Sequence, residues 1–216
     1  MRLDLSVYLV TDPDLCQPYG LERTVKEAVE GGVSIVQLRD KHASKEAMVE
    51  QAKRLKALLA PSGVPLIIND RLGVALASGA DGLHVGQGDA SVAEAREALG
   101  PDAIIGLSIN TLAQLNDAPV ERLDYVGLGP VFATASKQDH AQPLGFAGLA
   151  ALVEASVIPS VAIGGLKTRH VEAVKQSGAN GMAVISAICG QASPRAAAQG
   201  IAARWRDASV THSGGA

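Results

Sequence analysis

The sequence has few aromatic residues, few cysteines and no excess of positive charge. Aromatic residues make up 3 % of its 216 residues, and the two cysteines are Cys16 and Cys189. Two cysteines far apart in the chain, without CxxC spacing, form neither a disulfide framework nor a zinc site, so we expect two reduced thiols. A formal net charge of −3 provides no basic surface for a nucleic-acid backbone. We therefore expect no nucleic-acid partner, and a few local cations must hold any anionic ligand.

Long apolar runs are missing as well. No stretch reaches the roughly 18 apolar residues of a membrane-spanning helix. The start of the chain, MRLDLSVYLVTDPD, lacks the apolar segment of a secretory signal. We therefore expect a cytoplasmic protein with no membrane partner. With 47 % hydrophobic residues the chain can bury a sizeable core, and we expect one domain over 1–208 and a disordered tail over 209–216.

Short apolar runs rich in β-branched residues recur along the chain and predict strands. Because these runs are apolar almost throughout, they favour strands covered on both faces, as in a parallel sheet. The runs lie at 7–10, 34–38, 65–69, 82–85, 103–107, 124–128, 160–164 and 182–186.

Amphipathic stretches between these runs predict helices at 21–30, 45–59 and 91–99. In the second stretch Ala47, Leu55, Leu58 and Leu59 can share one face at helical spacing. Glycines at 31–32, 79–82 and 178–181 fall between a helix and the next strand, where a helix end requires positive φ.

Eight such units predict an α/β protein, a (β/α)8 TIM barrel with eight parallel strands. The chain is short for this fold, whose usual length is about 250 residues. An open doubly wound sheet is the alternative. The number of strands and the absence of a GxGxxG turn after the first strand favour the barrel.

Polar residues and glycines gather where the predicted strands end. In TIM barrels these positions and the loops after them face the active site. Solubility alone explains such convergence poorly, and it predicts a binding site at one rim. The residues are Gln37, Arg39, Asp40, Lys41, Asn69, Asp70, Arg71, Gly86, Gln87, Gly88, Asp89, Ser108, Gly129, Pro130, Thr134, Ala135, Ser136, Lys137, Gly164, Gly165, Ile185 and Ser186.

Cations and acids at this rim suggest a metal-bound polyanion. Arg39 and Lys41 could each be surface cations, but together with Lys137 they can hold one polyanion. Asp70 could cap a helix over 71–78. Mg2+, however, is typically held by one or two carboxylates plus phosphate oxygens and water, so Asp70 and Asp89 are candidate ligands.

A second anion site is expected after the last two strands. The loops after strands 7 and 8 are the usual phosphate site of these barrels, and glycine lets an anion approach backbone N–H groups. Gly164, Gly165 and Ser186 fit this role, although two tight turns would also explain the glycines. His84 is expected to be a packed, hydrogen-bonded histidine, and no covalent nucleophile is indicated.

A series of motifs resembles the thiamine-phosphate synthase family. The series runs in order from Tyr8 to Ile188 and is specific as a set. Its members are YLVTD (8–12), VQLRDK (36–41), IINDR (67–71), GADGLHVGQGD (79–89), IGLS (105–108), DYVGLGPVFATASK (124–137), PLGF (143–146), VAIGG (161–165) and GANGMAVISAI (178–188).

The resemblance implies a transferase that joins 4-amino-2-methyl-5-hydroxymethylpyrimidine diphosphate to 4-methyl-5-(2-phosphooxyethyl)thiazole with Mg2+ as cofactor, releasing pyrophosphate. Asp70 and Asp89 would ligate the metal. The pyrimidine diphosphate would contact Gln37, Leu38, Arg39, Asp40, Lys41, Asn69, Ser108 and Lys137. Of these, the catalytic residues would be Arg39, Lys41, Ser108 and Lys137. The thiazole phosphate would contact Thr134, Ala135, Ser136, Gly164, Gly165, Ile185 and Ser186.

The chain departs from the family pattern at two places. Ser136 replaces a threonine, which keeps the hydroxyl, and Ile109-Asn110 replaces a segment that commonly carries histidine. The thiazole tautomerase of the same superfamily is one alternative, but it has histidine at the position of Pro130 and lacks an acid at Asp89. A non-catalytic ligand-binding barrel is another, and a homodimer through the outer helices is possible for barrels of this kind.

Overall fold

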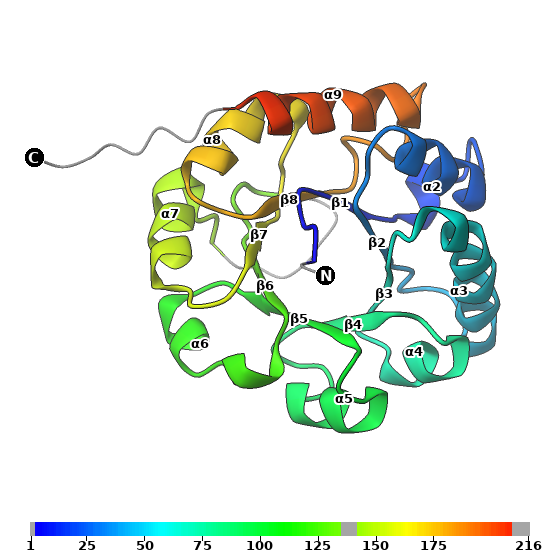
Figure 1. Ribbon diagram of the computed structural model, residues 1–216, viewed down its shortest axis with the longest axis horizontal. Helices are drawn as coiled ribbons and strands as arrows, with labels where there is room; N and C mark the ends of the chain where they lie inside the picture. Colours follow the sequence, from blue (N-terminus) through cyan, green and yellow to red (C-terminus); the bar gives the residue numbers. More distant parts are fainter. Residues whose placement is uncertain (1–2, 135–141, 209–216) are drawn as a thin grey trace, which may run out of the picture.

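The computed structural model describes residues 3–134 and 142–208, and its strands close into one parallel barrel (Figure 1). Pairing of Tyr8 with Ala183 joins the first strand to the last. The expected TIM barrel is therefore confirmed, and the open sheet is excluded. The strands are Val7–Val10 (β1), Ile35–Leu38 (β2), Leu66–Asn69 (β3), Gly82–Val85 (β4), Ile104–Ile109 (β5), Tyr125–Leu128 (β6), Ser160–Ala162 (β7) and Gly181–Val184 (β8).

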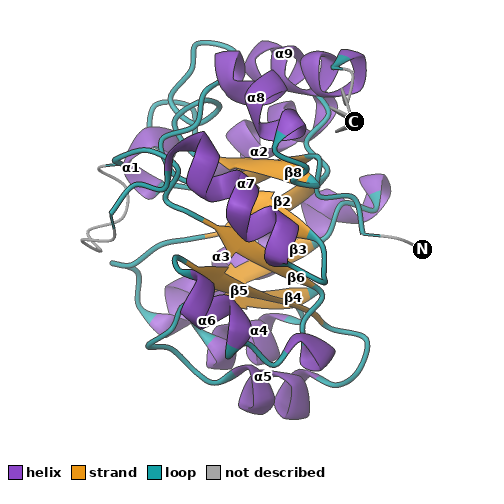
Figure 2. Ribbon diagram, turned by 90° about the vertical axis from the view of Figure 1, so that its left-hand side faces the viewer, coloured by secondary structure: helices purple, strands orange, loops and turns teal. Residues whose placement is uncertain are grey.

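Helices surround the strands on the outside, as Figure 2 shows. Within the described ranges, no helix has both the length and the apolar character needed to cross a bilayer. The α-helices are Pro13–Cys16 (α1), Leu21–Glu30 (α2), Lys45–Leu59 (α3), Leu72–Ser78 (α4), Val92–Leu99 (α5), Leu112–Asn116 (α6), Gly145–Ala155 (α7), Val171–Gln176 (α8) and Pro194–Asp207 (α9). Short 3₁₀ turns occupy Ala60–Ser62 (η1), Val120–Arg122 (η2) and Thr168–His170 (η3).

The expected helices are confirmed, with one boundary moved by a capping box. The hydroxyl of Ser91 accepts a hydrogen bond from the backbone N–H of Glu94 (3.2 Å), and the Glu94 carboxylate accepts one from the N–H of Ser91 (2.8 Å). Ser91 is therefore the N-cap, and the helix begins at Val92.

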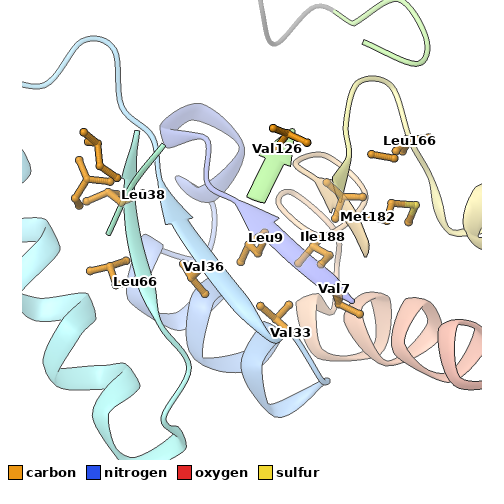
Figure 3. Packing of buried hydrophobic residues seen from close by; sticks show 14 of the residues in the cluster. Val7, Leu9, Val33, Val36, Leu38, Leu66, Val126, Leu166, Met182 and Ile188 are labelled. Carbon is orange, nitrogen blue, oxygen red and sulfur yellow. The ribbon is translucent and has the colours of Figure 1, made fainter. Parts of the chain in front are cut away.

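The strands are buried on both faces, so the molecule has two hydrophobic cores. Val7 and Leu9 point outward into the core beneath the helices (Figure 3). Tyr8 and Val10 alternate with them and point into the barrel. This two-sided burial explains why the strand sequences are apolar almost throughout.

The residues predicted to share one face of α3 are not all buried. Ala47 is exposed and Leu58 only half-buried, whereas Leu55 and Leu59 are buried. The helical spacing continues from Leu59 and Leu55 back to Ala52 and Met48, which are buried. Ala47 lies one position off this stripe.

Glycines adopt positive φ after three helices, as predicted. Gly32, Gly79 and Gly178 have φ of 104°, 67° and 85°, a backbone region that residues other than glycine rarely adopt.

Gly181 serves a different purpose. A Cβ atom there would lie 1.6 Å from the carbonyl oxygen of Leu5, so the closing strand needs glycine for its approach to the first.

Barrel closure also brings the two cysteines together. Cys16 ends α1 and Cys189 follows β8, and both are free and buried. Their Sγ atoms lie 3.5 Å apart in the core under the helices. Their separation of 173 positions in the chain gave no indication of this contact.

Candidate active site

A cavity of about 630 Å³ is lined by residues at the carboxyl ends of the strands. These strand ends lie on the side opposite the N-terminus (left in Figure 2). Residues at or after all eight strands line the cavity, which is the arrangement expected of a TIM-barrel site. Of the residues predicted to bind a substrate or the metal, twelve line this cavity. They are Gln37, Arg39, Lys41, Asn69, Asp70, Asp89, Ser108, Thr134, Gly164, Gly165, Ile185 and Ser186. Pro130 from the same predicted rim lines it too, whereas Arg71 does not.

The remaining predicted residues fall into two groups. The side chain of Leu38 is 1 % exposed and packs in the core beneath the helices, because strand alternation turns it away from the barrel interior. Asp40 is used locally, since its Oδ1 accepts hydrogen bonds from the N–H groups of His42 and Ala43. Neither residue lines the cavity, and contact of Leu38 and Asp40 with the substrate stays a prediction. Ala135, Ser136 and Lys137 lie outside the described residues.

A hydrogen-bonded chain of side chains forms the floor of the cavity. The amide Nε2 of Gln37 donates to the hydroxyl of Tyr8 (2.7 Å), which lies 2.7 Å from the hydroxyl of Tyr125. That hydroxyl lies 2.9 Å from Nδ1 of His84, and Nε2 of His84 lies 2.9 Å from Oγ of Ser108. His84 is therefore packed and hydrogen-bonded as expected, and it also lines the cavity.

The chemistry of these groups favours one direction for the protons. Burial raises the pKa of both Tyr8 and Tyr125, so both phenols stay protonated at neutral pH. Because Gln37 donates to the Tyr8 hydroxyl, that hydroxyl can donate to Tyr125, and the Tyr125 hydroxyl can donate to Nδ1 of His84. In this arrangement each hydroxyl accepts one hydrogen bond and donates one. His84 then donates from Nε2 to Ser108, which leaves the serine hydroxyl proton available to a ligand.

The loop after β2 is held in place by its own surroundings. The N–H of Arg39 donates to Oγ1 of Thr11 (3.0 Å). The guanidinium of Arg71 donates to the carbonyl oxygens of Ala43 (2.6 Å) and Lys41 (3.2 Å). These bonds fix the backbone from which Arg39 and Lys41 reach the cavity, so both cations are presented by a preformed loop.

Asp70 and Asp89 form an acidic pair at the edge of the cavity. Burial and the neighbouring Asp89 carboxylate raise the pKa of Asp70 to about 6, partly opposed by Asn69 and Lys41. Asp70 also has φ of 61°, unusual for a residue other than glycine. Asp89 is oriented by the N–H of Gly86, which donates to its Oδ2 (2.7 Å).

The alternative that Asp70 caps the following helix is wrong. The N-cap of α4 is Arg71, and no side chain caps that helix. The side chain of Asp70 interacts with that of Asp89 instead. Two close carboxylates whose charges repel each other favour a bound cation, and oxygen ligands suit Mg2+. No third histidine, cysteine or acid completes the set in the described part of the chain, so water and substrate oxygens would supply the rest.

Glycines and a hydroxyl form the opposite side of the cavity. Gly164 and Gly165 have φ of 103° and 65°, and a Cβ on Gly165 would lie 2.7 Å from Cβ of Phe132. The hydroxyl of Ser186 accepts a hydrogen bond from Nζ of Lys167 (2.6 Å). Close backbone and a hydroxyl are features of a phosphate site in this fold.

Several cavity residues were not predicted as site residues. They include Tyr8, His84, Asn110 and Gln114. Strand alternation over 7–10 would have indicated Tyr8, because it places Tyr8 and Val10 on one face. Asn110 is one of the departures from the family pattern, and its Nδ2 donates to the carbonyl oxygen of Gly129, linking the ends of β5 and β6.

A closed (β/α)8 barrel with a polar cavity at the carboxyl ends of its strands defines a TIM-barrel enzyme. The family model for thiamine monophosphate synthase matches residues 7–188. The chain belongs to the thiamine-phosphate synthase family.

Individual relatives agree with this assignment. A thiamine-phosphate synthase of Psychrobacter sp. (strain PRwf-1) is 55 % identical over 90 % of this chain and 92 % of its own length. One from Azorhizobium caulinodans is 53 % identical over 86 % and 88 %. The solved structure of a thiamine phosphate pyrophosphorylase from Pyrococcus furiosus superposes with a TM-score of 0.86 at 35 % identity, covering 95 % of this chain and 97 % of that one. The expected family and transferase activity are confirmed.

Proposed function

We propose that the protein forms thiamine phosphate and pyrophosphate from the pyrimidine diphosphate and the thiazole phosphate in this one cavity. The observation that carries the proposal is the division of the cavity into two unlike sides. Acids and cations follow β2 to β4, whereas glycines and a hydroxyl follow β7 and β8. A diphosphate suits the first side and a monophosphate the second.

On the diphosphate side, Arg39 and Lys41 would neutralise the leaving group, together with Lys137. Asp70 and Asp89 would hold Mg2+, which when bound supplies further positive charge to the diphosphate oxygens. The bond between the pyrimidine methylene and the diphosphate oxygen breaks with its electron pair leaving on oxygen. The thiazole nitrogen then supplies the pair for the new C–N bond.

The floor residues would orient the pyrimidine and donate protons without forming a covalent bond. Gln37 and Asn69 offer amide groups to the heterocycle, and Ser108 offers the hydroxyl proton that His84 leaves available. Holding the two substrates in line removes most of the entropic barrier to their reaction. A protein nucleophile is not required, because the thiazole nitrogen is the attacking atom.

On the monophosphate side, Gly164, Gly165, Ile185 and Ser186 would bind the phosphate of the thiazole, together with 134–136. Glycine at positive φ lets backbone N–H groups approach the anion. This arrangement would hold the thiazole ring against the pyrimidine methylene and keep its phosphate away from the leaving diphosphate.

The proposal is tested by mixing purified protein with both substrates and Mg2+. We expect thiamine phosphate and pyrophosphate in equal amounts, with formation lost when either substrate is omitted or the metal is chelated by EDTA. Absence of product beside an active relative would contradict the proposed function. Product formation unaffected by EDTA would contradict the metal assignment alone.

Two further predictions concern the location of the protein and its oligomeric state. A cytoplasmic location remains a prediction, to be tested by fractionation. Pairing of two chains through outer helices also remains a prediction, and sedimentation velocity at several concentrations would decide it.

A further inference from the structure

The described cations that line the cavity lie on one side of it. Arg39 and Lys41 both belong to the loop after β2. The side formed by β7 and β8 contributes glycines, apolar side chains and the hydroxyl of Ser186. A phosphate monoester carries close to two negative charges at neutral pH, so N–H groups alone leave most of its charge uncompensated.

Lys167 brings a cation to the wall on that side. It follows Gly164-Gly165-Leu166 in the loop after β7, and its Nζ donates to Oγ of Ser186 at 2.6 Å. Because Ser186 lines the cavity, the ammonium group of Lys167 is connected to the cavity wall through this single hydrogen bond. Lys167 forms no ion pair with a carboxylate in the described ranges, so its charge there remains uncompensated.

The backbone of Lys167 is anchored by an aromatic cluster. Its N–H donates to Nδ1 of His170 (3.1 Å). The ring of His170 packs on Phe132 at 4.9 Å and on Phe146 at 5.9 Å between ring centroids. Burial, Arg169 and Lys167 lower the pKa of His170, which keeps the ring neutral and able to accept this bond. The side chain can therefore change partner while its backbone stays in place.

From this geometry we infer that Lys167 binds the phosphate of the thiazole substrate. Its ammonium has three donors, of which one reaches Ser186, and a phosphate oxygen beside Ser186 would take another. Lys167 would thus recognise the anionic group of one substrate and take no part in the departure of the diphosphate from the other. The inference rests on the proposed function and adds a cation to its monophosphate side.

Steady-state kinetics of Lys167→Gln and Lys167→Arg test this role. For Lys167→Gln we expect KM for the thiazole phosphate to rise by about tenfold or more, because a charge-assisted hydrogen bond is lost. KM for the pyrimidine diphosphate should stay within about twofold. Lys167→Arg should recover part of the loss, since it keeps the charge. Lys26→Gln, a charge change at an exposed site on α2, serves as the matched control.

The thiazole alcohol that lacks the phosphate separates charge recognition from a structural role. Parent and Lys167→Gln should use this alcohol with equal kcat/KM, because the partner of the ammonium is missing. An equal loss with both thiazoles, or no change with the thiazole phosphate, would overturn the inference. If the parent protein made no product at all, the proposed function would fail instead. Thermal unfolding of each variant checks that the fold is intact.

Discussion

At the scale of the residue, Asp70 combines two unfavourable features. Its backbone adopts a left-handed conformation, and its carboxyl group is partly buried beside Asp89 with a pKa raised to about 6. Such local cost is common where a protein binds a ligand, because the surrounding structure maintains it for function. These two features should lower the free energy of unfolding when no metal is present.

We therefore expect Asp70→Asn to stabilise the metal-free protein at high pH. A folded-state pKa above the unfolded value means that stability is lost as pH rises through about 6 and is regained below about 4. Asparagine keeps the shape, tolerates positive φ and removes the charge. After allowance for solvent screening, the variant should gain of the order of 1 kcal/mol in the free energy of unfolding at pH 8, and this gain should shrink toward pH 4.

Urea unfolding in EDTA at pH 4, 6 and 8 measures this difference. A gain that does not depend on pH would contradict the assigned pKa. A loss of stability at pH 8 would mean that the carboxylate is stabilised by a partner in the metal-free protein.

The hydroxyl of Tyr8 offers a second test at this scale. Tyr8→Phe would leave the amide of Gln37 and the hydroxyl of Tyr125 without this buried partner. We expect a loss of about 1–3 kcal/mol in the free energy of unfolding. Tyr19→Phe is the control, because the hydroxyl of Tyr19 makes no hydrogen bond within the described residues. Equal stability of the two variants in chemical denaturation would show that the floor network contributes little.

At the scale of the element, strand contacts depend on glycines, because the missing Cβ atom lets a neighbouring backbone segment approach closely. Gly181 starts β8 and meets the carbonyl oxygen of Leu5, so Gly181→Ala forces the two segments apart. We expect the free energy of unfolding to fall by about 3 kcal/mol or more.

Gly200→Ala in the interior of α9 should instead raise the free energy of unfolding by about 0.5–1 kcal/mol, because its Cβ meets only Thr168 at 3.8 Å.

Thermal unfolding of these two alanine variants gives opposite shifts if the barrel closes as described. A fall in Tm for Gly200→Ala, or an unchanged Tm for Gly181→Ala, would contradict the packing of β8 against the segment before β1.

Sequence patterns predicted the elements better than their ends. All eight strands lie where apolar runs predicted them, since burial on both faces leaves a strong local signal. The run at 160–164 was expected to be strand throughout, yet β7 ends at Ala162. Gly164 and Gly165 leave the ladder at positive φ to form the rim. Apolar character alone does not mark this change.

At the scale of the whole molecule, barrel closure creates contacts that no local pattern contains. Tyr8 meets Tyr125 across the barrel at 2.7 Å, and Lys167 meets Ser186 between adjacent loops. The sequence predicted most of the cavity because strand ends share one rim. It missed Tyr8 and Tyr125 in the floor and it missed Lys167, since these contacts depend on which side chains face each other once the ring closes.

The central claim is that one cavity holds two separate anion sites, one on each side. The most direct test measures KM for both substrates, and the Mg2+ requirement, in Asp89→Asn and Ser186→Ala. We predict that Asp89→Asn raises the Mg2+ concentration needed and lowers kcat by about tenfold or more, with KM for the thiazole phosphate little changed. Ser186→Ala should raise KM for the thiazole phosphate and leave the Mg2+ requirement unchanged. If either variant impaired both substrates alike with its fold intact, the division of the cavity into two sites would be contradicted.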